Sequence, residues 1–408
     1  MKNIKINKTR LWDSLMDMAA IGATEKGGNC RLAASDEDKA GRDLFVNWAK
    51  KAGCEIIIDH IGNIFAKRLG QNNKAPSIMT GSHLDTQPTG GRFDGVLGVL
   101  AGLEIINTLN DHQIKTKVPI EIVCWTNEEG SRFSPAMMGS GVFAGIFSLD
   151  EIKNKEDNNG KKLGEELSRI GYSGASVEKQ KLSNYFELHI EQGPILENTK
   201  KTIGVVTAAQ GQRWYEVIIT GQESHAGPTP MSLRKDALVG ASKIVQEVNR
   251  IGNFYAPLAC ATVGVLDVSP NSRNVIPGRV FLTCDFRHPN DKILTKMDRD
   301  LKKFCESLKV EQNLEIDLID FWYSPPVNFN EDCIRSVRDA ANYLNYSFSD
   351  IVSGAGHDAV YISKIAPAAM IFVPCENGIS HNEIENASPE DCAAGTNVLL
   401  HAMLNSMK

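Results

Sequence analysis

Histidine and carboxylate side chains recur directly after apolar runs in this sequence. Imidazole and carboxylate groups suit zinc, manganese, cobalt or nickel better than a thiolate-selective metal. In an open α/β sheet, ligands bind outside the carboxyl ends of the strands, so side chains that follow several strands can converge there. We therefore expect a centre for divalent transition metals. The candidates that follow the apolar runs are His83, Asp85, Asp94, Glu128, Glu129, His189, Glu191, Glu376 and His381.

Each candidate also has an ordinary structural interpretation. A single histidine after a strand is more often structural than a ligand, Glu128–Glu129 is compatible with a solvated turn, and Asp94 is placed to cap a helix. Asp85 lies two residues after His83, where its carboxylate can orient the imidazole ring. The recurrence of the same residue types at equivalent strand ends favours a metal enzyme over these separate explanations.

The elements that must position these residues alternate between helix and strand. Ser35 precedes residues 36–51, whose apolar side chains recur at helical spacing, so we expect a capped helix there. Residues 95–109 predict a second helix that is almost wholly apolar. Strand, helix and strand in that order predict a βαβ unit in a largely parallel sheet. The expected strands are residues 55–59, 77–80 and 119–125.

The pattern changes from residue 213 onwards. Strands and helices follow one another in the order βαββαβ, which is the order of a ferredoxin-like unit. After residue 326 the chain again alternates helix and strand. The sequence therefore predicts a larger α/β domain, residues 1–212 and 327–408, interrupted by a smaller domain, residues 213–326. The expected elements of the insert are strands 213–221, 261–268, 279–287 and 314–320 and helices 233–252 and 291–308.

Length and composition narrow the class of protein. The 408 residues predict roughly two to three domains, and 42% hydrophobic with 23% charged residues is typical of a folded globular chain. A formal net charge of −6 disfavours general nucleic-acid binding. No apolar stretch approaches the roughly 18 residues of a membrane span, and the first residues do not resemble a secretory signal. Nine scattered cysteines without a C-x-x-C pair favour free thiols and a cytoplasmic location.

A series of short motifs resembles one enzyme superfamily over residues 20–395. H-L-D-T, G-G-R-F-D-G, N-E-E-G, E-L-H-I-E-Q-G and S-H-N-E are similar to motifs of the dinuclear-metal amidohydrolases of the aminoacylase/carboxypeptidase superfamily. Within it, the chain resembles the group of N-carbamoyl-amino-acid hydrolases, allantoate amidohydrolases and β-ureidopropionases. This resemblance implies a mixed-sheet, aminopeptidase-like catalytic domain with an inserted lid or dimerisation domain. Further matches are SHAGPTPM (224–231), NSRNVIPGRV (271–280), CDFRHP (284–289) and GAGHDA (354–359).

The resemblance also implies a set of catalytic roles. Two divalent transition metal ions per subunit are expected, zinc first, with manganese, nickel or cobalt as alternatives. His83 and His189 are expected on different metals, with Asp94 bridging the two. A hydroxide between the metals attacks the substrate, and Glu128 acts as the general base. The full ligand set implied by the resemblance is His83, Asp94, Glu129, His189 and His381.

The inserted domain is expected to bind the substrate. Arg287 would hold a carboxylate through a bidentate fork, although at a strand end it is equally compatible with a surface ion pair. Asn274 would assist it, and His225, which often comes from the partner subunit in this superfamily, would stabilise the oxyanion. A homodimer through the insert is therefore expected. His357 fits either a substrate contact or a tight structural turn. Supporting polar contacts are expected from Gln192, Gln210, Gly211 and Gln212.

The implied reaction is hydrolysis of an N-carbamoyl amino acid to the amino acid, carbon dioxide and ammonia. DTQPTGGRFDG and WTNEEGSRF look most like β-ureidopropionases, which favours N-carbamoyl-β-alanine (3-ureidopropanoate). N-carbamoyl-L-α-amino acids and allantoate are the alternatives. A catalytically inactive binding protein on the same fold is a different class, but the expected base and metal ligands are all present. A serine hydrolase is disfavoured because there is no G-x-S-x-G, and there is no H-E-x-x-H either.

Overall fold

The computed structural model describes residues 4–175 and 181–407. They form two compact units, divided between Thr207 and Ala208 and again between Asn328 and Phe329. The smaller unit is therefore an insert within the larger one, which we call the catalytic unit because the expected metal ligands and general base lie in it, and the expected bounds of 213 and 326 fall inside the insert. Among the described residues, no helix is long and apolar enough to cross a membrane.

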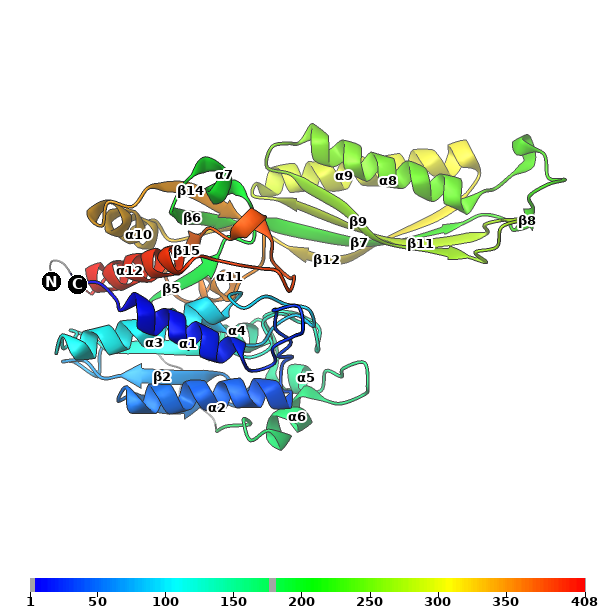
Figure 1. The fold of residues 1–408 in the computed structure, drawn as a ribbon. Helices are drawn as coiled ribbons and strands as arrows, with labels where there is room; N and C mark the ends of the chain where they lie inside the picture. The colour runs from blue at the N-terminus through cyan, green and yellow to red at the C-terminus, as the bar shows by residue number, and fades with distance from the viewer. Residues whose placement is uncertain (1–3, 176–180, 408) are drawn as a thin grey trace. The chain divides into compact units, whose positions relative to one another are not determined.

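A mixed sheet is the framework of the catalytic unit (Figure 1). Its order is β1-β2-β4-β3-β5-β15-β6, and β14 also pairs with β6. The pairs β3–β4, β3–β5 and β5–β15 are parallel, whereas the pairs of β1 with β2, β2 with β4, and β15 with β6 are antiparallel. The prediction of an α/β fold with a mixed sheet is confirmed. The strands are β1 (Glu55–Ile58), β2 (Ile64–Arg68), β3 (Ser77–His83), β4 (Ile120–Trp125), β5 (Leu182–Ile190), β6 (Ile203–Ala209), β14 (Phe348–Ser353) and β15 (Ala368–Val373).

Helices pack on the central strands of this sheet. Helices α3 and α12 lie against β3, β5 and β15, and α1 packs on both of these helices (Figure 1). Helix α2 begins where expected, because the Ser35 side chain accepts a hydrogen bond from the Asp38 N–H, and acidic residues fill its first turn. The helices are α1 (Lys8–Ala19), α2 (Asp36–Lys51), α3 (Val96–Asp111), α4 (Met138–Phe143), α5 (Leu149–Lys153), α6 (Leu163–Arg169), α7 (Ile195–Thr199), α10 (Glu331–Tyr343), α11 (Asp358–Ile362) and α12 (Pro389–Asn405).

Strands β3 and β5 extend beyond the apolar runs of their sequences. Strand β3 continues to His83, which is paired in register with Trp125 of β4. Strand β5 likewise includes His189, which is paired with Phe372 of β15. Both histidines are 1% exposed, because parallel neighbours and helices surround these strands. The two imidazoles are therefore held by sheet pairing rather than by flexible loops.

The insert has the expected βαββαβ order. Its four long strands form an antiparallel sheet of order β12-β7-β11-β9, and α8 and α9 pack on it. Strand β11 alternates buried and partly exposed residues, which is typical of a sheet with one covered face. The elements are β7 (Gly211–Thr220), α8 (Ala237–Phe254), β9 (Cys260–Ser269), β11 (Arg279–His288), α9 (Asp291–Gln312) and β12 (Glu315–Ser324), with the short strands β8 (Ser224–His225), β10 (Val275–Ile276) and β13 (Val327–Asn328).

The insert has a hydrophobic core of its own. On α8, Ala241, Ile244, Val248 and Ile251 recur at helical spacing and are at most 1% exposed. They meet the buried side chains of the sheet, among them Phe286. Burying one such isoleucine contributes roughly 1.5–3 kcal/mol. This core, separate from that of the catalytic unit, accounts for a chain that folds as two units.

Candidate active site and metal centre

Two buried histidines meet one oxygen of Asp94 at the carboxyl ends of β3 and β5. The Nε2 atoms of His83 and His189 lie 3.5 and 3.1 Å from Asp94 Oδ1. The Nδ1 atoms lie 2.8 Å from the Asp85 carbonyl oxygen and 3.0 Å from the Ile190 carbonyl oxygen, respectively. Because a carbonyl oxygen only accepts, each Nδ1 carries a proton, and each Nε2 faces Asp94, where it can carry a second proton or bind a metal ion.

A second group of ligands forms around the other oxygen of Asp94. His381 Nε2 lies 3.5 Å from Asp94 Oδ2 and 3.4 Å from Glu129 Oε2. In each group the donor atoms lie within 4.8 Å of one another. All five expected ligands are thus brought together, with Asp94 common to both groups. One expectation is wrong: His83 and His189 lie in the same group, because the ends of the adjacent strands β3 and β5 present them to the same carboxylate oxygen.

Charge and donor chemistry fit divalent metal ions. Among the described residues, no lysine or arginine pairs with Asp94, Glu128 or Glu129, and all three carboxylates are largely buried. Histidine nitrogens and carboxylate oxygens are the ligand types of zinc and its neighbours in the first transition row. Cations bound by these two groups would balance negative charge that no basic side chain balances.

The pKa values of these residues follow from burial and close charges. Burial, followed by neighbouring carboxylate charges, raises the pKa values of Glu128 and Glu129 well above their ordinary values. Burial opposes ionisation of Asp94 too, but the charges and hydrogen bonds of the two histidines outweigh it and hold its pKa well below the usual range. Burial lowers the pKa of His83, yet the charge of Glu128, the hydrogen bond to Asp94 and the other nearby carboxylate charges together outweigh it, and the pKa is raised. The same negative charge favours a proton or a metal ion at Nε2.

Asp85 holds the turn that carries Glu128 and Glu129 through two hydrogen bonds. The two oxygens of the Asp85 carboxylate accept hydrogen bonds from the Glu128 and Glu129 N–H groups, each at 3.2 Å. The sequence suggested that this carboxylate orients the His83 ring, but the backbone carbonyl of Asp85 does so. Glu128 belongs to neither ligand group, and its Oε2 lies 3.4 Å from His83 Nε2. Asp85 therefore holds the turn in which Glu129 belongs to a ligand group and Glu128 does not.

Two glutamines contact the ligands. Gln192 Nε2 donates to Asp94 Oδ2 at 2.7 Å, so Gln192, which we expected to contact substrate, is a partner of Asp94. Gln87 Nε2 donates to Glu129 Oε2 at 2.7 Å. Two other candidates lie outside both groups. Glu191 accepts the N–H groups that begin α7, and Glu376 accepts from Asn386.

His357 has the features of a ligand contact. Its ring centroid lies 4.6 Å from that of His189, and its buried Nε2 has no hydrogen-bond partner among the residues that the structure describes. Burial, aided by the charge of His189, lowers its pKa well below the ordinary value, so the ring is neutral. A buried unpaired nitrogen is costly, so its presence beside the ligands favours a substrate contact over a structural turn.

No sequence motif pointed to Glu385, which connects the loop of Asp94 with the loop of His381. Its Oε1 accepts hydrogen bonds from the Phe93 and Asp94 N–H groups at 3.0 and 3.1 Å. Its Oε2 lies 2.8 Å from Ser380 Oγ, which is 2.9 Å from Asp94 Oδ2. Burial, with the charge of Asp94, raises its pKa to about 7. A glutamate four residues after His381 in a polar loop gave no sequence signal of this role.

Two glycines make the close approaches in this centre feasible. Gly95 has φ +69°, and a Cβ there would lie 2.4 Å from the His83 ring. A Cβ at Gly91 would lie 2.0 Å from the Glu385 carboxyl carbon. Larger residues would displace a metal-ligand candidate in the first case and Glu385 in the second. The G-G-R-F-D-G motif thus leaves room for the His83 ring and for the carboxyl of Glu385, which comes from a remote part of the chain.

The expected substrate residues of the insert form two separate pairs. Arg287 and Gln212 are cross-strand partners on β11 and β7, and the Arg287 guanidinium donates to Asp285 Oδ2 at 2.8 and 2.9 Å. His225 on β8 is exposed and pairs in register with Val275, next to Asn274. Gln212 is the second residue of β7, whereas β8 follows the other end of β7, at the tip of the insert (Figure 1). The eight residue steps from Gln212 to Thr220 span about 26 Å along β7.

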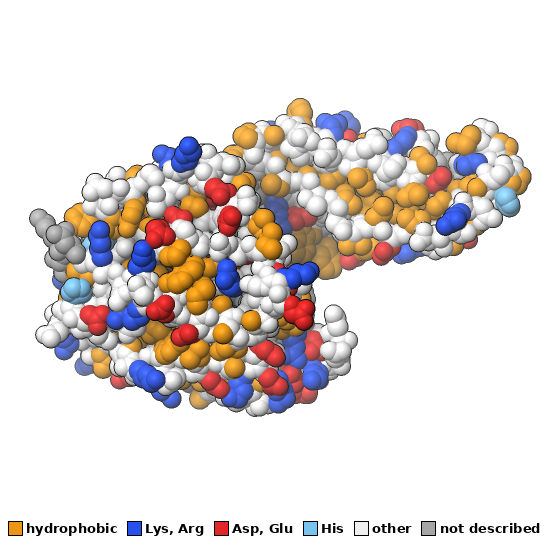
Figure 2. Space-filling view, in the orientation of Figure 1, with side chains coloured by type: hydrophobic (Ala, Val, Ile, Leu, Met, Phe, Trp, Pro, Cys, Tyr) orange, Lys and Arg blue, Asp and Glu red, His pale blue; other side chains and the backbone are white. Residues whose placement is uncertain are grey.

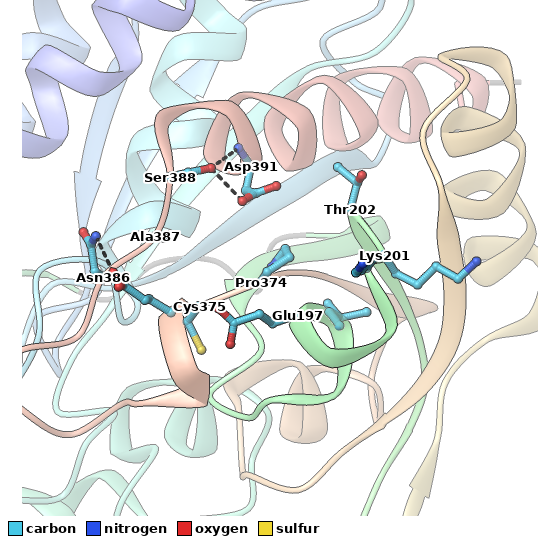
Figure 3. A pocket seen from close by; sticks show the side chains of 12 residues that line it. Glu197, Lys201, Thr202, Pro374, Cys375, Asn386, Ala387, Ser388 and Asp391 are labelled. Carbon is cyan, nitrogen blue, oxygen red and sulfur yellow. Dashed lines mark hydrogen bonds between the residues drawn. The ribbon is translucent and has the colours of Figure 1, made fainter.

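A cavity elsewhere on the catalytic unit is distinct from this centre. Its volume is about 520 Å³, and it lies between the end of β15, the turn after α7 and the start of α12 (Figure 3). Charged side chains of both signs line it, including Glu197, Lys200 and Asp391. None of the five expected ligands lines it. The metal-ligand groups therefore mark the functional site more clearly than cavity size does.

Comparisons with known proteins agree with this geometry. Residues 79–405 match the model of peptidase family M20/M25/M40. An N-carbamoyl-L-amino-acid amidohydrolase of Rhizobium meliloti is 47% identical, over 99% of this chain and 98% of that protein. Allantoate amidohydrolase of Bacillus subtilis is 32% identical, over 96% of each chain. A crystal structure of an amidase of the hydantoinase/carbamoylase family from Burkholderia multivorans matches with a TM-score of 0.94 and 59% identity, over 99% of this chain and 98% of that one. The chain belongs to peptidase family M20/M25/M40, as its motifs predicted.

Proposed function

We propose that this chain is a metal-dependent amidohydrolase that converts N-carbamoyl amino acids and water to amino acids, carbon dioxide and ammonia. The observation that supports this most directly is the pair of ligand groups that share Asp94, with Glu128 beside them but outside both. Relatives named as N-carbamoyl-L-amino-acid and allantoate amidohydrolases match over nearly the whole chain. The sequence-based expectation of an amidohydrolase is therefore confirmed at this level.

Each residue of the proposed active site would have a separate role in hydrolysis. His83, His189 and Asp94 would hold one metal ion, and Asp94, Glu129 and His381 the other. Divalent ions there would supply Lewis acidity towards water and the ureido carbonyl, which two donating nitrogens make a poor electrophile. Glu128 would take a proton from the attacking water and deliver it to the leaving nitrogen. His357 would donate a hydrogen bond to the substrate through its unpaired nitrogen. The ions are proposed to be zinc, with manganese, nickel or cobalt as alternatives.

The structure changes the order in which we rank the candidate substrates of this class. The loop around Gln87 suggested N-carbamoyl-β-alanine, but Gln87 donates to Glu129, and Thr86 Oγ accepts from the Arg31 N–H. These residues support the ligand loops, so they give no physical reason to select a β-amino acid. We therefore place N-carbamoyl-L-α-amino acids first and retain N-carbamoyl-β-alanine and allantoate as alternatives.

The insert would supply the polar groups that recognise the substrate. Arg287, aided by Gln212 and Asn274, would bind the substrate carboxylate, and His225 would stabilise the oxyanion. Arg287 and His225 lie too far apart in one insert to contact the same small molecule. This separation supports a homodimer in which His225 acts on the partner's substrate. Hydrophobic side chains are exposed over the strands of the insert (Figure 2), including Val265 and Leu266 on the edge strand β9.

A substrate panel tests the proposal. Chelator-treated protein is reconstituted with zinc or manganese and assayed for ammonia release from N-carbamoyl-L-α-amino acids, their D-enantiomers, N-carbamoyl-β-alanine and allantoate. We expect the highest kcat/KM with an N-carbamoyl-L-α-amino acid. Glu128→Gln protein, prepared in parallel, controls for contaminating hydrolases. Absence of ammonia release from every ureido compound, in protein that has bound metal, would overturn the proposal.

A further inference from the structure

Two loops that are remote in sequence must meet to complete the second ligand group. Residues 86–95 carry Asp94, and residues 374–388 carry His381. The first group, by contrast, takes its histidines from the adjacent strands β3 and β5. His381 is itself 52% exposed at its side chain and has φ +54°, so its own surroundings fix it weakly. Something else must hold its loop beside Asp94.

Glu385 makes the direct connection between these loops. It is 1% exposed and bonds to both the Phe93 and Asp94 N–H groups across a sequence separation of more than 290 residues. Its second oxygen reaches Ser380, the neighbour of His381. The Gly91 position leaves room for this carboxyl and for nothing larger than hydrogen. All of its bonds therefore fix the distance between Asp94 and the loop of His381.

We infer that Glu385 is a positioning residue for the second metal site, formed by Asp94, Glu129 and His381, and that the first site does not depend on it. This inference rests on the proposed metal-dependent function. It assigns Glu385 no contact with the substrate or the ions. Losing such an outer hydrogen-bonding partner typically weakens metal affinity by about 10- to 100-fold. Here that loss should affect only one of two ions.

The test is a metal titration of apo-protein against a chromophoric chelator, which needs no activity measurement. Wild-type protein should bind two ions. Glu385→Ala should bind the first ion with unchanged affinity and the second about 10- to 100-fold more weakly. Glu385→Gln should stay close to wild type, because its amide oxygen accepts both N–H bonds and its NH₂ donates to Ser380 Oγ, leaving the Ser380 proton for Asp94. Glu376→Gln, an exposed glutamate of the same loop, is the matched control and should bind both ions normally.

A second variant separates positioning from loss of folding. Gly91→Ala leaves Glu385 in the sequence but forces its carboxyl away, so it should reproduce the selective weakening of the second ion. Circular dichroism checks that each variant is folded. If Glu385→Ala and Gly91→Ala bind both ions as wild type does, or if Glu385→Gln is as weak as Glu385→Ala, the inference is wrong and the proposed function stands. If wild-type protein binds no ion, both fail.

Discussion

The proposed metal centre of the catalytic unit and the proposed substrate residues of the insert are built in different ways. In the catalytic unit, His83 and His189 are 1% exposed, and backbone carbonyls fix both rings. In the insert, His225 and Asn274 are exposed, and Arg287 is held by a neighbour on its own strand. The first region is complete within one unit, whereas the second divides its groups between the four-stranded sheet and the separate β8–β10 pair.

We attribute this difference to the different requirements of metal binding and substrate binding. Metal ligands must be held close to their final geometry before the ion arrives, so strand ends and buried hydrogen bonds suit them. Substrate contacts can be completed on binding by domain or subunit movement, so exposed strands and loops are sufficient. Four experiments test whether the two regions differ in this way.

Removal of metal should have the largest effect, and only through the catalytic unit. Dialysis against a chelator should abolish ammonia release, because both ligand groups lose their ions, and a divalent transition metal should restore it. Elemental analysis checks the metal content at each stage. His225→Ala, the control from the insert, should keep the metal content of the wild type. Full activity in protein shown to be metal-free would contradict the assignment of the centre.

The adjacent glutamates should separate catalysis from metal binding. Glu128→Gln keeps the shape of the side chain but removes the base, so kcat should fall by roughly 10²–10⁴-fold while metal content persists. Glu129→Gln should instead weaken metal loading, because Glu129 belongs to the second ligand group. Kinetics and elemental analysis are measured on the same preparations. The reverse pattern would exchange the two roles.

Mixed dimers should show whether the insert acts across subunits. Glu128→Gln and His225→Ala proteins should each be nearly inactive alone. If His225 serves the partner's site, random reassociation should restore about a quarter of the wild-type activity, because half of the dimers are mixed and each has one intact site. Each variant mixed with itself is the control. Failure of recovery in mixtures shown to contain hybrid dimers would place His225 in its own subunit's site.

Arg287→Lys should give the smallest effect of the four. Lysine retains the charge but loses the planar fork, so kcat/KM for N-carbamoyl amino acids should fall about 10-fold, mainly through KM, with metal content unchanged. The substrate amide, which lacks the carboxylate, should be a poor substrate that is nearly indifferent to the change. An equal loss with the amide would mean that Arg287 supports the fold or the dimer.

Local patterns predicted much of the fold. Helix α2 matches the expected residues 36–51, because a serine cap, an acidic first turn and apolar spacing all act within a few residues. Helix α3 begins within one residue of its expected start, and the insert has the expected order of elements. The strand ends were less well predicted, since His83 and His189 continue strands whose length depends on neighbouring strands.

The residue types that could bind metal, the strands and helices that carry them, and the family of the chain could all be predicted from the sequence. The partners of these residues became known only from the folded chain. It placed His83 and His189 on the same oxygen of Asp94, turned Gln192 towards Asp94, and brought Glu385 to the Asp94 backbone. The reason is the separation along the chain over which each kind of interaction acts. Helix caps and apolar periodicity act over a few residues, whereas these contacts join segments up to about 290 residues apart that meet only when β3, β5 and β15 pair in one sheet.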